Sequence, residues 1–594
     1  MCSRQFGENG CVEYSSSSNG SLLLTLFNRS LRDIKDEDIN ICLENAYKEA
    51  YNSENINDRY NKFTNLIILS FLIRNCRGGK GEKNIFYIYF NFLYKKIPRT
   101  MNELIKIIAE YGYYKDLFQI IIKCDLNKKI IKKIICFIAK QLNKDIENYE
   151  NNKPISLLAK WMPRENKELY NKINNKLSAF GFYNIISEII SKVSIKDDKT
   201  NETKFVKYRK IISMLSNKLN VVETYMCDIN NKWHNIEFKT VSSIALNNYK
   251  KAFSGKSKNM SKNDDKLNDR IKCKENYINF LLNETKVNAS QLDIDKLIKN
   301  VFEKQFRLPN NSTLMDLIDN EMYDLALSNR QFNSMVSYIN DQLNSIEKDL
   351  SENENNPINF DITNIKCMID VSGSMEGQPM MVAIGLGLIF MKLQLLKSWD
   401  AHQTFITFET NPSLINIEDC NTLPAMVHKI KKSSWGGSTN FLKAFDLIIQ
   451  ESRDDFSKIP SMLLVFSDMQ FDSAFYNNSD NSDNWDTMYE IICNKFKDIT
   501  DKIPIIVFWN LRGHPTGTPV KADTNGVIQI SGYSASLLKM LLFGSELDKK
   551  EKLNPLQTLI KTIESKEYNK IREILGWDNN ILSNSIFKEE IDNL

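Results

Sequence analysis

Cysteine and histidine, the residues that build zinc sites and disulfide frameworks, are sparse in this chain. Its 594 residues include 11 Cys, with no CxxC pair, and four His, at positions 234, 402, 428 and 514. Structural zinc sites and disulfide-rich folds need closely spaced Cys and His. The scattered thiols argue against both and are typical of a reducing compartment, so we expect a cytoplasmic protein.

Long hydrophobic runs and a secretory leader are also lacking. The first residues, "MCSRQFGENG", do not place a charged segment before an apolar one. The longest apolar run, Met380 to Met391, is shorter than the roughly 20 residues that span a bilayer. With 42% hydrophobic and 26% charged residues, the composition predicts a globular protein of several domains without membrane association.

Charge is distributed unevenly along the chain. Residues 1–344 contain 54 Lys and Arg against 40 Asp and Glu, a net charge of +14. Residues 345–594 contain 24 against 34, a net charge of −10. This asymmetry predicts different binding partners for the two parts, or an attraction between them.

The first part of the chain has helical periodicity. After a polar segment, residues 1–20, that we expect to be flexible, apolar residues recur at spacings of three and four through residues 21–350. Long helical segments with short breaks predict a stacked, HEAT-like helical array. Within it, the polar and charged stretch 254–274 predicts an exposed basic loop, and "SENENNPIN" predicts a linker over 351–360.

Strand-like and helical runs alternate after the linker. "NIKCMID", "HQTFITF", "SMLLVFSD" and "IPIIVFWN" are short apolar strands, and "MVAIGLGLIFMKLQLLK" and "NFLKAFDLIIQES" are helical. Such alternation predicts a Rossmann-like, mainly parallel sheet covered on both faces, here over residues 361–545. Residues 546–594 read as a helical extension. The expected fold class is therefore an all-α array followed by an α/β domain.

Polar side chains follow two of the predicted strands. Asp370, Ser372 and Ser374 come at the end of the first strand, and Asp468 follows "LLVFS". Between them in sequence, "SSWGGSTNF" places Thr439 before a helix, with Ser438 as an alternative. In parallel sheets such residues converge at the carboxyl edge, and carboxylate and hydroxyl oxygens suit Mg²⁺. The alternative is a polar cluster at the strand ends with no metal.

This set resembles the metal-ion-dependent adhesion site of von Willebrand factor type A domains. The resemblance implies that Ser372 and Ser374 bind the ion directly and Thr439 does so directly or through water. Asp370 and Asp468 would act directly or through water. It also implies an open coordination position that receives a carboxylate from a protein partner.

Further segments are similar to an uncharacterised family that joins a helical region to a C-terminal von Willebrand A-like domain. They include "RNCRGGKGE", "EYGYYKDL", "LAKWMPRE", "SDMQFD" and "FWNLRG". The architecture resembles that of the Ro autoantigen, whose TROVE module is a ring of HEAT-like helices closed by a von Willebrand A domain. Ro binds small structured RNAs, so the resemblance implies a structured small RNA as a second partner.

Basic residues in two segments are candidate phosphate contacts. "CRGGKGEK" lacks the spacing of a phosphate-binding P-loop, and its alternative interpretation is a helix C-terminal turn with exposed charges. "NKKIIKKII" places lysines one turn apart, which is also typical of a solvated helix face. We interpret Trp161, in "WMPRE", as a packing residue. The candidate RNA contacts are Arg77, Lys80, Lys83, Lys128, Lys129, Lys132 and Lys133.

Three functions fit these features. The first is a non-enzymatic scaffold that binds RNA through its basic helices and a protein carboxylate through the metal site. The second is an assembly factor that binds proteins alone. The third, a metal-dependent hydrolase, finds little support, because we identify no catalytic base or phosphate-binding lysine beside Asp370.

Overall fold

The chain folds into two compact units, and each unit is assembled from segments that are far apart in the sequence. Unit 1 consists of residues 1–73, 77–82 and 281–568, and unit 2 of residues 74–76, 83–280 and 569–594. The computed structural model describes residues 4–6, 12–15, 20–178, 181–184, 186, 204–227, 232–255, 264–283, 292–307, 309–353, 361–398, 403–408, 412–433, 441–453, 459–471, 488–497, 503–513, 517–546, 553–578 and 581–594.

A six-stranded sheet forms the centre of unit 1. Its strand order is β5 (Ser413–Asn416), β4 (Thr404–Phe408), β3 (Ile365–Asp370), β6 (Met462–Ser467), β7 (Ile505–Asn510) and β9 (Val527–Ser531). All neighbours are parallel except the edge strand β5, which is antiparallel to β4. The four strands predicted from their apolar runs are confirmed. Strands β5 and β9 were not predicted, because each is short and lacks a continuous apolar run.

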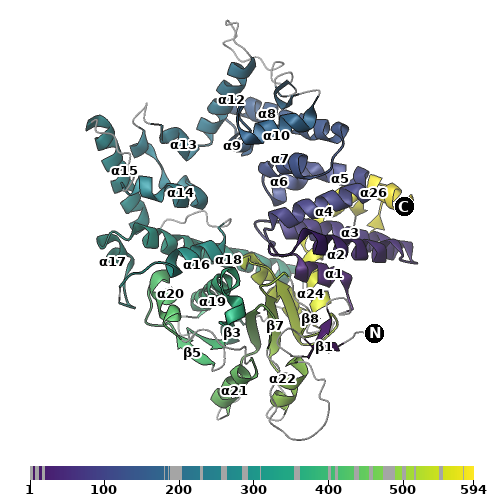
Figure 1. The fold of residues 1–594 in the computed structure, drawn as a ribbon, viewed down its shortest axis with the longest axis vertical. Helices are drawn as coiled ribbons and strands as arrows, with labels where there is room; N and C mark the ends of the chain where they lie inside the picture. The colour runs from purple at the N-terminus through teal and green to yellow at the C-terminus, as the bar shows by residue number, and fades with distance from the viewer. Residues whose placement is uncertain are drawn as a thin grey trace. The chain divides into compact units, whose positions relative to one another are not determined.

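Helices cover both faces of this sheet (Figure 1). On one face, α21 (Phe441–Ser452) and α22 (Met488–Lys497) form a core with inward-facing strand residues such as Val465. On the other face, α19 (Gln378–Lys397) contacts β3 and β6. A Cβ atom on Gly387 would lie 2.6 Å from the Ile369 side chain, so only glycine permits this close approach of helix and strand.

Helix α19 is the one helix, within the described residues, that is long and apolar enough to cross a membrane. Most of it is buried inside unit 1: 78% of its apolar window is covered. Its other side contacts α16 (Ile294–Phe302) closely, where a Cβ on Gly385 would lie 2.3 Å from the Ile294 side chain. Burial on all sides explains an apolar surface without a polar stripe.

A small sheet in unit 1 contains the N-terminal segment. Strands β1 (Arg4–Phe6) and β2 (Val12–Ser15) form an antiparallel pair, and β2 also pairs with β8 (Gly517–Thr518). The expectation of a loose segment over residues 1–20 is therefore wrong for these strands. Tyr14 is only 5% exposed, and burial of its ring against a partner far along the chain outweighs the polar local composition.

The other α-helices described in unit 1 come from the N-terminal, central and C-terminal parts of the sequence. They are α1 (Leu22–Arg29), α2 (Asp36–Tyr51), α3 (Ile56–Arg74, whose last residue belongs to unit 2), α17 (Leu314–Asp319), α18 (Tyr323–Asn353), α20 (Leu423–Lys431), α23 (Lys539–Glu546) and α24 (Pro555–Glu564). Helix α1 contacts both β9 and α24. Helix α18 continues through Asn353, so the first residues of the predicted linker are helical; residues 354–360 lie outside the described ranges.

Unit 2 is helical apart from one short β-hairpin in its described residues, β10 (Trp577–Asp578) and β11 (Ile581–Leu582). The α-helices in the described part of this unit are α4 (Lys83–Lys96), α5 (Pro98–Leu104), α6 (Ile108–Tyr111), α7 (Tyr114–Lys123), α8 (Lys128–Glu150), α9 (Leu158–Trp161), α10 (Glu168–Leu177), α12 (Lys204–Lys218), α13 (Val222–Tyr225), α14 (Ser243–Phe253), α15 (Asp264–Leu282, which ends in unit 1), α25 (Asn569–Leu575) and α26 (Ile586–Asp592). An α region combined with an α/β region confirms the predicted fold class at this level.

The predicted loop over residues 254–274 is wrong from Asp264 onward, where α15 begins. Low apolar content suggested a loop, but polar contacts help to fix this helix, together with buried residues such as Cys273 and Tyr277. Asp269 is 6% exposed and accepts hydrogen bonds from the backbone N–H groups of Trp233, at 3.1 Å, and His234, at 3.0 Å. Residues 256–263 lie outside the described ranges.

Candidate metal centre

The predicted oxygen ligands meet at the carboxyl ends of β3 and β6, which are adjacent strands. Asp370 is the last residue of β3, and Asp468 follows the last residue of β6. Their exposed fractions are 0% and 1%. Because the two strands are parallel and in register, both carboxylates emerge at the same edge of the sheet. Thr439 lies outside the described residues, so its place in this set stays a prediction.

Hydrogen bonds fix Asp370 on both of its oxygens. Oδ1 accepts the backbone N–H of Ser372 at 3.0 Å, and Oδ2 accepts the Ser467 hydroxyl at 2.6 Å. Ser467 also accepts the backbone N–H of Met469 at 3.0 Å. Ser467 was not among the predicted site residues. Its position, directly before Asp468 at a strand end, is the signal that could have identified it.

The two loop hydroxyls lie close together. Ser372 Oγ and Ser374 Oγ are 3.2 Å apart, with Ser372 buried and Ser374 exposed. Adjacent oxygen ligands of an octahedral Mg²⁺ ion are about 3 Å apart, given metal–oxygen distances of 2.0–2.1 Å. The separation of the two hydroxyls therefore fits a shared ion.

Two neighbouring carboxylates in a buried site disfavour full ionisation. Burial, and then the charge of Asp468, raise the pKa of Asp370 to about 7, although the hydrogen bonds from Ser372 and Ser467 oppose the shift. The described residues contain no cluster of three or more His, Cys, Asp and Glu side chains suited to a metal. A metal here would therefore rely on two carboxylates and several hydroxyls, a hard-oxygen donor set that suits Mg²⁺.

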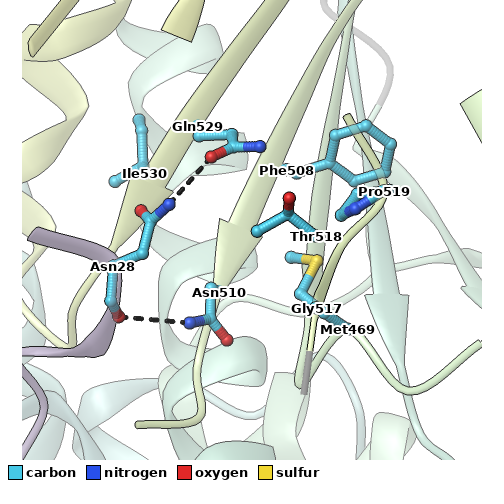
Figure 2. Close-up of a pocket in the computed structure, with 9 residues that line it drawn as sticks. All are labelled: Asn28, Met469, Phe508, Asn510, Gly517, Thr518, Pro519, Gln529 and Ile530. Carbon is cyan, nitrogen blue, oxygen red and sulfur yellow. Dashed lines mark hydrogen bonds between the residues drawn. The ribbon is translucent and has the colours of Figure 1, made fainter. Parts of the chain in front are cut away.

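A turn after β6 sets the direction of the chain beyond Asp468. Met469 has φ +65°, a left-handed conformation that costs free energy for a residue with a side chain. Figure 2 shows Met469 at a small cavity of about 20 Å³, where Asn28 of α1 bonds to Gln529 and Asn510. Hydrogen bonds from α1 thus brace the sheet edge next to the candidate site.

A larger cavity, of about 740 Å³, opens beside the serine loop. Ser372, Gly373 and Glu376 line one side of it, and Asp295 and Lys299 of α16 line another. Asp295 accepts a hydrogen bond from Gln378 Nε2 at 2.9 Å. The candidate site therefore has an adjacent space large enough for side chains of another molecule.

The prediction that Lys80 contacts RNA is wrong. This side chain is 1% exposed and cannot reach a phosphate at the surface. Its Nζ donates to the backbone carbonyls of Phe27 and Ser30, which satisfies the C-terminal end of α1. Burial lowers the pKa of Lys80 well below its usual range. Lys80 therefore has a structural role: it links the segment "CRGGKGEK" to the end of α1 by hydrogen bonds.

The other predicted RNA contacts lie at or near the surface. Arg77 in unit 1 and Lys83 in unit 2 are exposed. Lys128, Lys129 and Lys133 are exposed and Lys132 is half-buried, all within the first two turns of α8. The four lysines of α8 therefore lie together in unit 2, whereas Arg77 belongs to unit 1.

The chain is similar to proteins and domains whose functions are undefined. Residues 364–577 match a domain of unknown function, DUF7788, and residues 128–342 match a second, DUF2828. The chain is 27% identical to "Uncharacterized protein L728" of Acanthamoeba polyphaga mimivirus over 588 residues, which cover 95% of this chain and 88% of the relative. No solved structure matches it significantly.

Proposed function

We propose that the protein is a non-enzymatic scaffold whose von Willebrand A-like sheet domain holds Mg²⁺ for a partner's carboxylate. The observation that carries the proposal is the pair of buried carboxylates, Asp370 and Asp468, beside the hydroxyls of Ser372 and Ser374. Ionising both of these carboxylates out of water is disfavoured, and a bound cation would stabilise the doubly ionised state. Thr439 would complete the set.

The cavity beside Ser372 supports a role in binding another protein. It offers an approach to the loop hydroxyls from outside the sheet. A bound Mg²⁺ ion would act as a Lewis acid toward an incoming carboxylate, since Mg²⁺ prefers oxygen ligands and binds few protein groups at once. The residues of this chain would orient the ion and limit its access to water.

Calorimetric titration with Mg²⁺ tests the site. We expect wild-type protein to bind one ion and the Ser372→Ala/Ser374→Ala variant to bind it at least roughly tenfold more weakly, because two direct ligands are lost. Ser461→Ala is the matched control, because Ser461 is an exposed serine just before the opposite end of β6, hydrogen-bonded to the carbonyl of Asn364. Equal Mg²⁺ binding by all three proteins would contradict the proposed metal site.

Peptide arrays test the proposed partner chemistry. We expect wild-type protein with Mg²⁺ to retain peptides that contain Asp or Glu, and to lose them with chelator or when the peptides carry Asn or Gln instead. Retention that is independent of Mg²⁺ would contradict a metal-bridged carboxylate. Phosphoester hydrolysis that disappears in Asp370→Ala would instead favour a hydrolase.

RNA binding by the HEAT-like helices of unit 2, as the likeness to Ro suggests, is the second part of the proposal. The start of α8 supports it: four lysines occupy the first two turns, and no acidic residue lies in the first turn. Cations at a helix N-terminus oppose the helix dipole, so this placement favours a role in binding anions. The nine cysteines within the described ranges are free thiols, as expected in a cytoplasmic ribonucleoprotein.

Salt dependence of RNA binding tests this part. We expect the full-length protein to bind a small structured RNA with an affinity that falls steeply as salt rises, because phosphate contacts release counterions. If it binds no RNA at low ionic strength, the alternative of a purely protein-binding assembly factor is favoured.

A further inference from the structure

An aromatic pair of unit 2 lies at a partly exposed position. Tyr113 precedes α7, and Trp161 is the last residue of α9. Their ring centroids are 5.9 Å apart with an angle of 51° between the planes, and both side chains are half-buried. Fully packed aromatic residues are common in this unit, so a pair that keeps part of its surface accessible is distinctive.

Three exposed lysines surround this pair. The Nζ atoms of Lys115 and Lys160 lie 5.6 and 5.7 Å from the centroid of the Trp161 ring. Lys83 Nζ lies 5.8 Å from the centroid of Tyr113. Among the described residues, no carboxylate lies within ion-pair distance of Lys115 or Lys160. The rim of the aromatic pair therefore carries positive charge.

A neighbouring acidic side chain, Asp116, is paired with an arginine. It is 2% exposed, and its Oδ2 accepts Arg74 Nη2 at 2.6 Å and the backbone N–H of Tyr113 at 2.7 Å. Arg74 is itself buried, with its guanidinium carbon 5.0 Å from the centroid of Tyr113. This buried ion pair holds Tyr113 in place.

Aromatic faces with a basic rim match one class of ligand. A cationic ligand would be repelled by three lysines, and an apolar ligand would gain nothing from them. An unpaired nucleotide has both a flat base that stacks on aromatic rings and a phosphate that attracts lysine. The flexible lysine side chains can move from the ring face to the phosphates when a base stacks.

We propose that Tyr113 and Trp161 with Lys83, Lys115 and Lys160 form a platform that stacks an unpaired base of single-stranded RNA and contacts its adjacent phosphates. The inference rests on the RNA-binding part of the proposed function and adds to it a site and a class of RNA. It replaces our interpretation of Trp161 as a packing residue.

Binding of a short fluorescent single-stranded RNA and of an equally charged RNA duplex to the full-length protein tests the platform. We expect Trp161→Ala to weaken single-strand binding roughly 10- to 100-fold, the typical loss for one stacked base, with little change for duplex. Trp161→Phe preserves an aromatic face and should remain close to wild type. It also covers the case in which Trp161→Ala fails to fold.

Lys115→Gln/Lys160→Gln tests the basic rim. This variant should reduce the salt dependence of single-strand binding and lower the preference for single strand over duplex. The matched control is Lys140→Gln/Lys144→Gln, which removes two exposed lysines from α8 and should leave that preference unchanged. A nucleoside monophosphate serves as a competitor: displacement of RNA at micromolar concentration would assign the site to free nucleotides and overturn the proposal.

The possible failures are distinguishable. If wild-type protein binds RNA with a steep salt dependence, and well-folded Trp161→Ala binds single strands equally well, the platform is wrong and the RNA-binding function stands. If wild-type protein binds neither single-stranded nor duplex RNA at low salt, the RNA-binding function fails, and the platform fails with it.

Discussion

The two compact units differ most in charge. Unit 2 contains 42 Lys and Arg against 25 Asp and Glu, a net charge of +17, whereas unit 1 contains 36 against 49, a net charge of −13. Both imbalances exceed the +14 and −10 of the two parts divided by chain order. Charge thus follows the units formed by contact more closely than position in the sequence, which suggests that each unit serves a different partner.

The units also differ in how they bury polar groups. Unit 2 neutralises a buried arginine with a buried carboxylate, Arg74 with Asp116. Unit 1 also pairs an arginine with a buried carboxylate, Arg32 with Glu82, but it differs in burying two neighbouring carboxylates, Asp370 and Asp468. A hydrogen bond between neutral amides joins its α1 to β9. Two like charges buried side by side suggest a binding site, whereas a buried ion pair suggests a structural role.

The largest expected effect is on the ion pair of unit 2. Asp116→Ala leaves Arg74 buried without a counterion and removes the acceptor of the Tyr87 hydroxyl, at 2.6 Å. We expect a loss of about 3–5 kcal/mol in the free energy of unfolding. Denaturant unfolding, with Mg²⁺ binding as a second readout, checks this. Loss of Mg²⁺ binding at native conditions would show that the variant also disrupts unit 1.

A smaller loss is expected at the neutral contact of unit 1. Asn28→Ala removes the donor to Gln529 Oε1, at 2.8 Å, and leaves that buried amide oxygen without this partner (Figure 2). We expect a loss of about 1–3 kcal/mol. The measurement is again denaturant unfolding, with Gln529→Ala and the double variant completing a cycle. Additive losses would mean that the two amides do not stabilise each other.

The paired carboxylates of unit 1 predict a pH dependence. Because the pKa of Asp370 is raised to about 7, above its value of about 3.9 in unfolded chains, the metal-free fold gains stability at low pH and loses it as pH rises through 7. Mg²⁺ favours the ionised carboxylate, so its affinity should fall by up to about tenfold per pH unit below 7.

Thermal unfolding at pH 6 and pH 8, with Mg²⁺ or with chelator, measures this dependence. The stabilisation by Mg²⁺ should be larger at pH 8, and Asp370→Asn should abolish it. An equal Mg²⁺ effect at both pH values would mean that no proton is displaced by the metal.

The smallest effect is expected for a surface ion pair of unit 2. Lys570 Nζ lies 2.5 Å from Glu110 Oε1, and the two side chains are 52% and 48% exposed. Solvent screens such pairs, so Lys570→Gln should change the free energy of unfolding by less than about 1 kcal/mol. A loss as large as that of Asp116→Ala would remove the distinction between buried and exposed charges in this unit.

Patterns within short segments of the sequence correctly predicted the positions of those strands and candidate site residues that depend on the segment itself. Continuous apolar runs identified four of the six sheet strands, and the spacing of Asp370, Ser372 and Ser374 placed them correctly at the end of β3. The burial of Lys80 could not be predicted, because its acceptors are the carbonyls of Phe27 and Ser30, about 50 positions earlier.

Contacts between distant segments account for the other differences. Strand β2 pairs with β8, which lies about 500 residues further along the chain, and this pairing stabilises it. Tyr113 and Trp161 are 48 positions apart, so neither local sequence shows that these two rings pack against each other. A single sequence shows how apolar residues are spaced within each segment, but it does not show which segments pack together in the fold.

The hydrogen bond between Asn28 and Gln529 has a consequence for synthesis. The two residues are 501 positions apart, so at 5–20 residues per second the ribosome needs roughly 25 to 100 s to produce the second after the first. During that interval the apolar face of α1 has no sheet to cover it. Nascent chains should therefore depend on chaperones that shield this early helix, and ribosome profiling of chaperone-bound chains should find it occupied until β9 emerges.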